Sequence, residues 1–299
     1  MIVDGHIHPI PGIVNEETLI REMDKAGVSK AFLIALDVHS SDLDSIEISG
    51  KVFNRLMEAC IWDVRVIEEM KRILNSARIE NIYVAELVKN NPKRFIGIGS
   101  INPARGKSYI ESKIREIDKL ELLGVKFIPT LQFFNPIKVK KNIQKILKYC
   151  RDSGKIAIFH TGCDPYVWEH PHISEDGNPK YLEKVIEKFQ EVPTIIAHMG
   201  SYSRNYPGIW FKEALQLGVR CSNVLFDISA VPYLVCRRGY VEEIRRHIGF
   251  HRVLFGSDYP VVGANIASII SEVCNTPYLS EKEKRLVLGL NAVNLIKIF

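Results

Sequence analysis

Two histidines near the amino terminus are the first residues whose spacing suggests chemistry. His6 and His8 lie in the run DGHIHP (residues 4–9), at the end of a short apolar segment that reads as a strand. Side chains two residues apart on a strand point to the same face of the sheet. Two imidazoles held side by side can bind a divalent transition metal. Taken alone, the pair is equally compatible with two histidines that are hydrogen-bonded to neighbouring groups.

Three further side chains of the kinds that bind metals follow apolar runs in the same way. His160 ends the run KIAIFH, His198 ends PTIIAH, and Asp258 closely follows RVLF. The carboxyl ends of parallel strands meet at one rim of a barrel, so these residues and the histidine pair would converge there. Each residue has an ordinary alternative, such as a carbonyl partner for a histidine or a helix cap for the aspartate. The set as a whole favours a metal site.

The elements that would position these residues alternate along the whole chain. Short apolar strands are predicted at residues 2–8, 30–36, 94–101, 125–129, 155–160, 193–198, 222–228 and 252–255. Helical patterns are predicted at 16–26, 78–89, 108–123, 139–152, 179–190, 206–217 and 240–248, and from 266 and 281 onward. This alternation predicts an α/β protein with a TIM (β/α)8 barrel. A doubly wound open sheet is the second choice, but no glycine-rich phosphate loop follows the first strand.

Length and composition agree with one globular barrel. The chain has 299 residues, which is normal for a single α/β barrel, so residues 1–299 are predicted to form one domain. The net charge of +5 is spread over mixed helix faces, and no nucleic-acid-binding motif is present. The 6 cysteines form no CxxC pair, which is typical of a reducing compartment. With neither a signal peptide nor a membrane span in view, we expect a cytoplasmic protein.

One segment is too long for the minimal barrel. Residues 37–76 separate the second strand from its helix, and residues 52–74 have a helical pattern. An insertion there would lie at the carboxyl-terminal face of the barrel, where active sites of this fold are built. It could serve as a lid or as the interface of a homodimer. An extra packed helix without a catalytic role is an equally good interpretation.

A series of motifs resembles a known family. In chain order they are DGHIHP (4–9), NIYVAELVKNNPKRFIGIGSINP (81–103), GVKFIP (124–129), FHTG (159–162), AHMGS (197–201), GSDYP (256–260) and the closing NAVNLIKIF. Together they resemble the amidohydrolase superfamily, in the amidohydrolase-related branch that includes aminocarboxymuconate-semialdehyde decarboxylase. The resemblance covers nearly the whole chain and implies the same barrel, but it does not specify a substrate.

The resemblance also implies roles for the residues at the rim. His6, His8, His160 and Asp258 would bind one divalent metal, and His198 would lie beside it. Zinc is the first expectation for three histidines and one carboxylate, with manganese, iron or cobalt as alternatives. Some members of the superfamily bridge two metals with a carbamylated lysine on the fourth strand. Lys126 is the only candidate, but it falls near the start of the predicted strand, so we expect one metal and a structural lysine.

These roles lead to a predicted reaction on a small-molecule substrate. A bound divalent metal lowers the pKa of its water to about 7, and Asp258 could accept the proton while His198 steadies the water or the developing oxyanion. The first expectation is therefore a hydrolase acting on a small carboxylated or cyclic amide, lactone or ester. A non-oxidative decarboxylase of an aromatic or muconate-type acid is the alternative. A metal-binding protein without catalysis is a third hypothesis.

Substrate specificity would come from the loops that follow the strands. The candidate substrate-binding residues are Arg105, Gln132, Tyr166, Trp168 and Arg204. Arg204 could bind a substrate carboxylate through its two-pronged guanidinium, although a surface arginine is an equally good interpretation. A second HxH pair, His170 and His172, lies in a polar, proline-containing stretch that is typical of an exposed loop.

Overall fold

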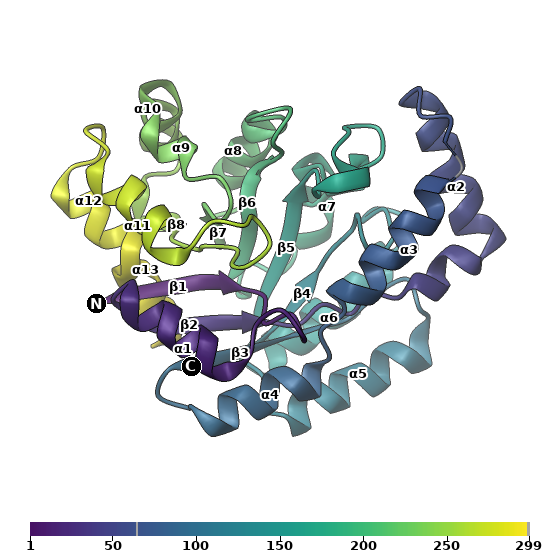
Figure 1. Cartoon of the computed structure of the whole chain (residues 1–299), viewed down its shortest axis with the longest axis horizontal. Helices are drawn as coiled ribbons and strands as arrows, with labels where there is room; N and C mark the ends of the chain where they lie inside the picture. The colour runs from purple at the N-terminus through teal and green to yellow at the C-terminus, as the bar shows by residue number, and fades with distance from the viewer. Residues whose placement is uncertain (64, 298–299) are drawn as a thin grey trace.

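The computed structural model of the chain, described over residues 1–63 and 65–297, contains one sheet of parallel strands arranged in chain order. The strands are β1 (Ile2–Ile7), β2 (Val28–Ile34), β3 (Phe95–Ser100), β4 (Gly124–Phe127), β5 (Ile156–Gly162), β6 (Thr194–Tyr202), β7 (Val224–Asp227) and β8 (Val253–Leu254). They curl around a common axis, with helices on the outside (Figure 1). The predicted TIM barrel is confirmed, and the doubly wound alternative is wrong.

Backbone hydrogen bonds between β1 and the segment that begins with β8 close the barrel. Gly5 N donates to Phe255 O at 2.9 Å, Asp258 N donates to His6 O at 2.8 Å, and His8 N donates to Tyr259 O at 3.0 Å. His6, His8 and Asp258 therefore lie on the two sides of a single seam. The closure itself brings these three side chains together.

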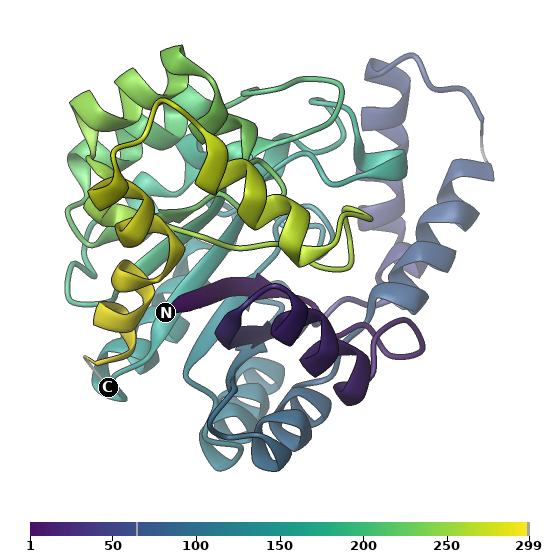
Figure 2. The ribbon, with the colours of Figure 1, turned by 60° about the vertical axis from the view of Figure 1, so that its left-hand side comes forward.

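The helices cover the outer face of the sheet (Figures 1 and 2). They are α1 (Glu16–Lys25), α2 (Ile46–Glu58), α3 (Arg65–Ala77), α4 (Asn81–Asn90), α5 (Lys107–Lys119), α6 (Lys140–Asp152), α7 (Glu183–Ile186), α8 (Phe211–Arg220), α9 (Tyr233–Cys236), α10 (Arg238–His247), α11 (Ile266–Asn275), α12 (Glu281–Arg285) and α13 (Asn291–Ile296). Short 3-10 turns lie at Ser40–Asp44, Tyr166–Trp168, Glu175–Gly177, Pro179–Tyr181 and Phe250–Arg252, and a π-helical turn at Leu286–Leu290. None of these helices is long and apolar enough to cross a membrane.

Apolar residues form two layers of core. The larger layer lies between the outer face of the sheet and the helices. The smaller layer fills the inside of the barrel and includes Val3, Ile156 and Ile195, which stand near the starts of their strands. Ala292 and Leu295 of α13 pack into this inner layer. The amino-terminal end of the barrel is therefore plugged with side chains, as in other barrels of this kind.

The insertion between β2 and α4 contains two helices instead of one. The predicted helix at 52–74 is replaced by α2 and α3, with a break between them; residue 64 of that prediction and the last two residues of the closing motif lie outside the described residues. Both helices stand beside the barrel at the right-hand edge of Figure 1. The buried carboxylate of Asp176 holds α2 in place through Lys51 and Arg55, with 2.8 Å between Asp176 Oδ2 and Arg55 Nη1.

Two other predicted helices differ from those observed. Residues 179–190 form only a 3-10 turn and the short helix α7, while the helix predicted at 206–217 begins at Phe211. In the first case Pro179 follows Asn178, whose side chain accepts a hydrogen bond from Lys180 N at 2.9 Å and so favours a tight turn. In the second, Pro207 and Gly208, which has a φ of 76°, keep the chain out of a helix before Trp210.

Candidate active site

The His6 and His8 side chains face one another at the carboxyl-terminal rim of the barrel. His8 Nδ1 lies 3.0 Å from the carbonyl oxygen of Ile34, and His6 Nδ1 lies 2.8 Å from Asp227 Oδ2. Since both partners accept hydrogen bonds, each neutral ring carries its proton on Nδ1 and a lone pair on Nε2. The two Nε2 atoms are 3.2 Å apart. Two lone pairs directed at the same space fit a shared cation.

Asp258 supplies a carboxylate to the same space. Its Oδ1 atom lies 3.7 Å from Nε2 of His6 and 3.7 Å from Nε2 of His8. Its other oxygen, Oδ2, accepts a hydrogen bond from the Tyr202 hydroxyl at 2.8 Å. The Tyr202 hydroxyl thus orients the carboxylate so that Oδ1 faces the two histidines. This donor set of two imidazoles and a carboxylate suits a divalent metal.

His160 lies next to these residues, farther from the histidine pair. Its ring centroid is 4.9 Å from that of His198, and it belongs to neither of the two compact groups of ligand atoms that the described residues form, His6–His8–Asp258 and His6–His198–Asp227. Within the described chain, the buried Nε2 of His160 has no hydrogen-bond partner, although Asp164 Oδ2 is 3.2 Å away. A buried ring nitrogen without a partner fits contact with a metal or a substrate.

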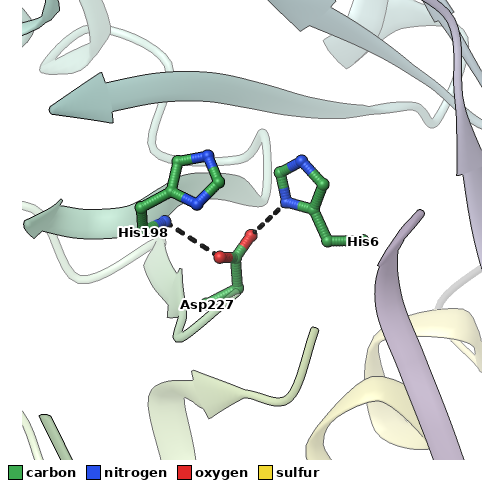
Figure 3. A group of neighbouring side chains, drawn as sticks. All are labelled: His6, His198 and Asp227. Carbon is green, nitrogen blue, oxygen red and sulfur yellow. Dashed lines mark hydrogen bonds and ion pairs between the residues drawn. The ribbon is translucent and has the colours of Figure 1, made fainter. Parts of the chain in front are cut away.

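Asp227, at the end of β7, connects His6 of β1 with His198 of β6 (Figure 3). One carboxylate oxygen receives the Nδ1 proton of His6, and the other accepts from His198 N at 2.9 Å. Ser229 adds a carbonyl oxygen 2.9 Å from His198 Nδ1. Our sequence reasoning missed Asp227, although it ends the apolar run VLF just as His160 ends its own strand.

The position of His198 depends on a bulge in β6. His160 pairs with Ala197, and Gly162 pairs with Tyr202, so the single residue Thr161 lies opposite residues 198–201. His198 has a φ of 61°, in the left-handed region, and Asp258 is left-handed too at 57°. Such backbones are uncommon for residues other than glycine and cluster at functional sites.

Burial controls the protonation of the site. It lowers the pKa of His6, His160 and His198 well below the ordinary value and that of His8 to about 3, with the charge of Lys126 acting in the same direction. The imidazoles are therefore neutral, as metal ligands must be. Burial also raises the pKa of the Asp258 carboxyl to about 7. An added cation would favour the ionised carboxylate.

Lys126 is not the remote structural lysine that we expected. Its side chain is buried, and its Nζ atom lies 3.0 Å from His6 Nε2. The strand β4 covers only Gly124–Phe127, so its third residue already reaches the rim. Burial lowers the pKa of the Lys126 amine to about 8, against the attraction of Asp227 and Asp258. The amine therefore still carries its charge at neutral pH for most of the time.

A cavity of about 200 Å³ opens over these residues. Lys126, His8, His160, His198 and Asp258 contribute its polar groups, together with Asp164 and Tyr202. The remaining wall is mainly apolar: Ile10, Ile13, Leu36, Ile73, Ala77, Ile128, Leu131, Pro165, Trp168, Pro260 and Val261. Since Ile73 and Ala77 belong to α3, the insertion forms part of the wall.

The predicted substrate-binding residues separate into two groups. Trp168 and Tyr166 both line the cavity; Trp168 is 1% exposed and belongs to the wall, whereas Tyr166 is 71% exposed and lies at the rim. Arg105 is not part of this lining because it is paired with Asp42. Gln132 is buried, and its side chain bonds to Ile128 N at 2.9 Å and Asp37 O at 3.0 Å. We therefore assign Arg105 and Gln132 structural roles and not substrate binding.

Arg204 is also absent from the lining of this cavity. It is exposed and lines a separate cleft farther out, together with Tyr166 and Tyr202. A carboxylate bound by Arg204 would therefore lie outside the cavity that contains the histidine pair. The second HxH pair, His170 and His172, stacks with ring centroids 5.3 Å apart outside the cavity lining.

Comparisons with known proteins show what the chain is similar to in sequence and in fold. A family model described as amidohydrolase matches residues 3–298. A 2-amino-3-carboxymuconate-6-semialdehyde decarboxylase from Dictyostelium discoideum is 27% identical over 177 residues, which cover 50% of this chain and 45% of the relative. The match thus spans less than half of that relative's length.

Two solved structures have the same fold along almost the whole chain. An uncharacterised TIM-barrel protein from Bordetella bronchiseptica superposes with a TM-score of 0.71 at 17% identity, covering 99% of this chain and 98% of its own. A 5-carboxyvanillate decarboxylase from Novosphingobium aromaticivorans, complexed with manganese and 4-hydroxy-3-methoxy-5-nitrobenzoic acid, gives 0.58 at 18% identity, covering 95% and 81%.

Proposed function

Since the chain belongs to the amidohydrolase family, we propose that it is a metal-dependent decarboxylase of a small aromatic or muconate-type carboxylic acid. The observation that carries this proposal is the buried amine of Lys126, 3.0 Å from His6 Nε2 in a cavity whose wall is mainly apolar. A single buried cation beside the histidine pair is suited to receive a substrate carboxylate. This reverses the order of our first expectation, which placed hydrolysis ahead of decarboxylation.

His6, His8, His160 and Asp258 are the residues that we propose as ligands of one divalent metal, with zinc or manganese as the leading candidates. The facing lone pairs of His6 and His8 and the unpartnered Nε2 of His160 support this choice. When bound, the metal supplies Lewis-acid polarisation of a substrate oxygen. The manganese-containing decarboxylase of similar fold is consistent with this assignment.

Residues of the chain would orient the substrate, exclude water and transfer the proton. Lys126 would orient the carboxylate that leaves, and the apolar wall would exclude water, which disfavours the charged acid relative to neutral CO2. The electron pair of the broken carbon–carbon bond stays on the substrate carbon. Asp258 would take up a proton from solvent and deliver it to this carbon, while the Tyr202 hydroxyl holds Oδ2. One proton is consumed, and one CO2 is released.

The size of the cavity supports a compact substrate. An apolar cavity of about 150 Å³ is large enough for benzene, so about 200 Å³ accommodates one ring with small polar substituents. Trp168 and Ile128 offer flat and apolar contacts for such a ring. The names of the two decarboxylase relatives, which act on a carboxymuconate and a carboxyvanillate, point to the same class of acid.

A hydrolase remains the second candidate because of His198. Its Nδ1 faces the Ser229 carbonyl oxygen at 2.9 Å, so its Nε2 carries the lone pair, and the side chain lines the cavity. An imidazole in this position can accept a proton from a water molecule that attacks an ester or lactone. Decarboxylation needs no such water, so the products formed distinguish the two reactions.

The test is to incubate the metal-loaded chain with hydroxybenzoic, carboxyvanillic and muconic acids and to measure CO2. We expect turnover of at least one acid, and a loss of at least about 1,000-fold in kcat for Asp258→Asn, with metal content by plasma mass spectrometry reduced only in part. Asp152→Asn is the matched control because Asp152 is exposed on α6 and pairs with Arg151. Ester or lactone hydrolysis without CO2 would favour the second candidate. Full metal occupancy without either activity would contradict both.

A further inference from the structure

A second hollow adjoins the cavity on its outer side. It is lined by residues of the loops that follow β5, β6, β7 and β8, and we call it the outer cleft. Four residues line both the cavity and the outer cleft: Pro165, Tyr166, Tyr202 and Val261. A molecule whose reacting end lies in the cavity can therefore extend into the outer cleft past the exposed Tyr166 ring.

Two guanidinium groups line the outer cleft, those of Arg204 and Arg237. Both residues are exposed, and no ion pair joins either of them to a carboxylate of residues 1–63 or 65–297. Other arginines, such as Arg55 and Arg105, form ion pairs with aspartates. Two unpaired guanidinium groups in one concave surface attract anions, and each can bind a carboxylate through two parallel hydrogen bonds.

The acidic residue of the outer cleft is already engaged. Glu169 Oε1 accepts hydrogen bonds from Arg204 N at 2.9 Å, from Asn205 N at 3.1 Å and from the Ser203 hydroxyl. These bonds fold the loop that presents the Arg204 side chain and spread the negative charge of Glu169 over three donors. Glu169 thus supports the loop without pairing with either guanidinium group.

Arg237 is held by a neighbouring ring. Its guanidinium carbon lies 5.1 Å from the centroid of Tyr233, within the range of a cation–π interaction. The Tyr233 hydroxyl donates to Ser201 O at 3.0 Å and accepts from Gly208 N at 2.9 Å, which fixes the ring against the β6 loop. Stacking leaves the N–H edge of the guanidinium group available for a ligand.

We infer that the outer cleft binds a second anionic group of the substrate, so that the preferred substrates are dicarboxylic acids with one carboxylate at Lys126 and the other at Arg204 and Arg237. This inference rests on the proposed function for the identity of the inner carboxylate. It names the substrate class by its two negative charges. An acid with only one carboxylate fills the cavity and leaves the outer cleft without a partner.

The test measures binding, so it does not depend on turnover. Calorimetric titrations of the zinc-saturated full chain compare two matched pairs of acids: benzoate with isophthalate, and phenylacetate with 1,4-phenylenediacetate. We expect the dicarboxylate of at least one pair to bind about ten-fold more tightly than its monocarboxylate. The double variant Arg204→Gln with Arg237→Gln should lose this advantage and leave monocarboxylate affinity unchanged. Arg238→Gln, next in the chain, should retain it because Arg238 pairs with Glu242.

The outcomes separate this inference from the proposed function. Equal affinity within both pairs, or no measurable binding of any of the four acids, would overturn the inference. So would a dicarboxylate advantage that survives in the double variant. A dicarboxylate advantage that depends on Arg204 and Arg237, in a chain that releases no CO2 from any acid, would support the outer cleft and contradict decarboxylation.

Discussion

At the scale of single residues, Asp227 links two parts of the site that the chain separates widely. It contacts the His6 ring through one oxygen and the His198 backbone through the other. A carboxylate that holds the remote nitrogen of a metal-binding imidazole sets its orientation and tautomer. Asp227 therefore positions His6 without any need to touch a metal itself.

Replacing Asp227 should accordingly weaken metal binding while the ligands remain. We expect Asp227→Asn to lower zinc affinity by about 10- to 100-fold, the usual cost of losing such a partner. Competition with a chromogenic chelator measures this affinity. Asp118→Asn, an exposed change on α5, should leave it unchanged. Wild-type affinity in Asp227→Asn would show that the hydrogen bond does not orient His6.

Lys126 and a metal would place two positive charges close together around His6. Because the pKa of the Lys126 amine is lowered to about 8, mainly by burial, its repulsion of a metal should be strong at pH 7 and should fade above pH 8. We expect Lys126→Met to bind zinc about ten-fold more tightly than wild type at pH 7 and about equally at pH 9. Chelator competition at both values tests this. A constant difference between the two pH values would contradict a charged Lys126.

The sequence predicted the position of a site residue where that residue follows an apolar strand. It did not where contacts between distant residues set the position. His6, His8, His160, His198 and Asp258 were all found as polar residues that follow apolar runs, and the same rule would have found Asp227. Lys126 was misplaced because the sequence does not reveal that β4 ends at Phe127. The sequence did not show where the Arg204 side chain lies, because Glu169 folds its loop through a contact across 35 residues.

At the scale of elements, the eight strands were predictable because each buried parallel strand is an uninterrupted apolar run. The bulge in β6 was not, because Thr161 of the neighbouring strand creates it: the Thr161 hydroxyl donates to Ala197 O at 2.6 Å and accepts from Gly200 N at 2.9 Å. The split of the insertion into α2 and α3 was missed as well, since the apolar spacing continues through the break.

The attachment of α2 depends on one buried carboxylate, that of Asp176. Burial opposes its charge, but hydrogen bonds and attraction from Arg55 and Lys51 outweigh burial and lower its pKa below the ordinary 3.8. The stabilisation by these ion pairs is therefore complete above pH 3.8 and disappears as the pH falls through the lowered pKa. At neutral pH, α2 should remain fixed to the turn at Glu175–Gly177.

Removing this charge should loosen the insertion selectively. We expect Asp176→Asn to reduce the free energy of unfolding by about 2 kcal/mol, since two partly buried cations lose their partner. Hydrogen exchange should rise in α2 and stay unchanged in β5. Asp63→Asn, which breaks an exposed pair with Arg65, should leave the free energy of unfolding nearly unchanged. Equal exchange in α2 of wild type and Asp176→Asn would show that other contacts hold the helix.

At the scale of the whole molecule, one end of the barrel contains the candidate active site and the other end is filled by core side chains. Lys126 and the histidines gather at the carboxyl-terminal rim, whereas α13 plugs the opposite end with Ala292 and Leu295. The inner core between them contains Val3, Ile98 and Ile158. Stability and chemistry should therefore respond to different substitutions.

Leu295→Ala tests this division. Leu295 is 3% exposed, and its truncation should leave a cavity that costs about 2–5 kcal/mol and lowers the Tm by several degrees. Zinc stoichiometry and kcat at 25 °C should match wild type, because the rim residues are held by the seam between β1 and Asp258 and by Asp227. Leu290→Ala is the control, since Leu290 is 48% exposed and its truncation should change the Tm little. Loss of zinc in folded Leu295→Ala would show that packing at the plugged end also determines the geometry of the site.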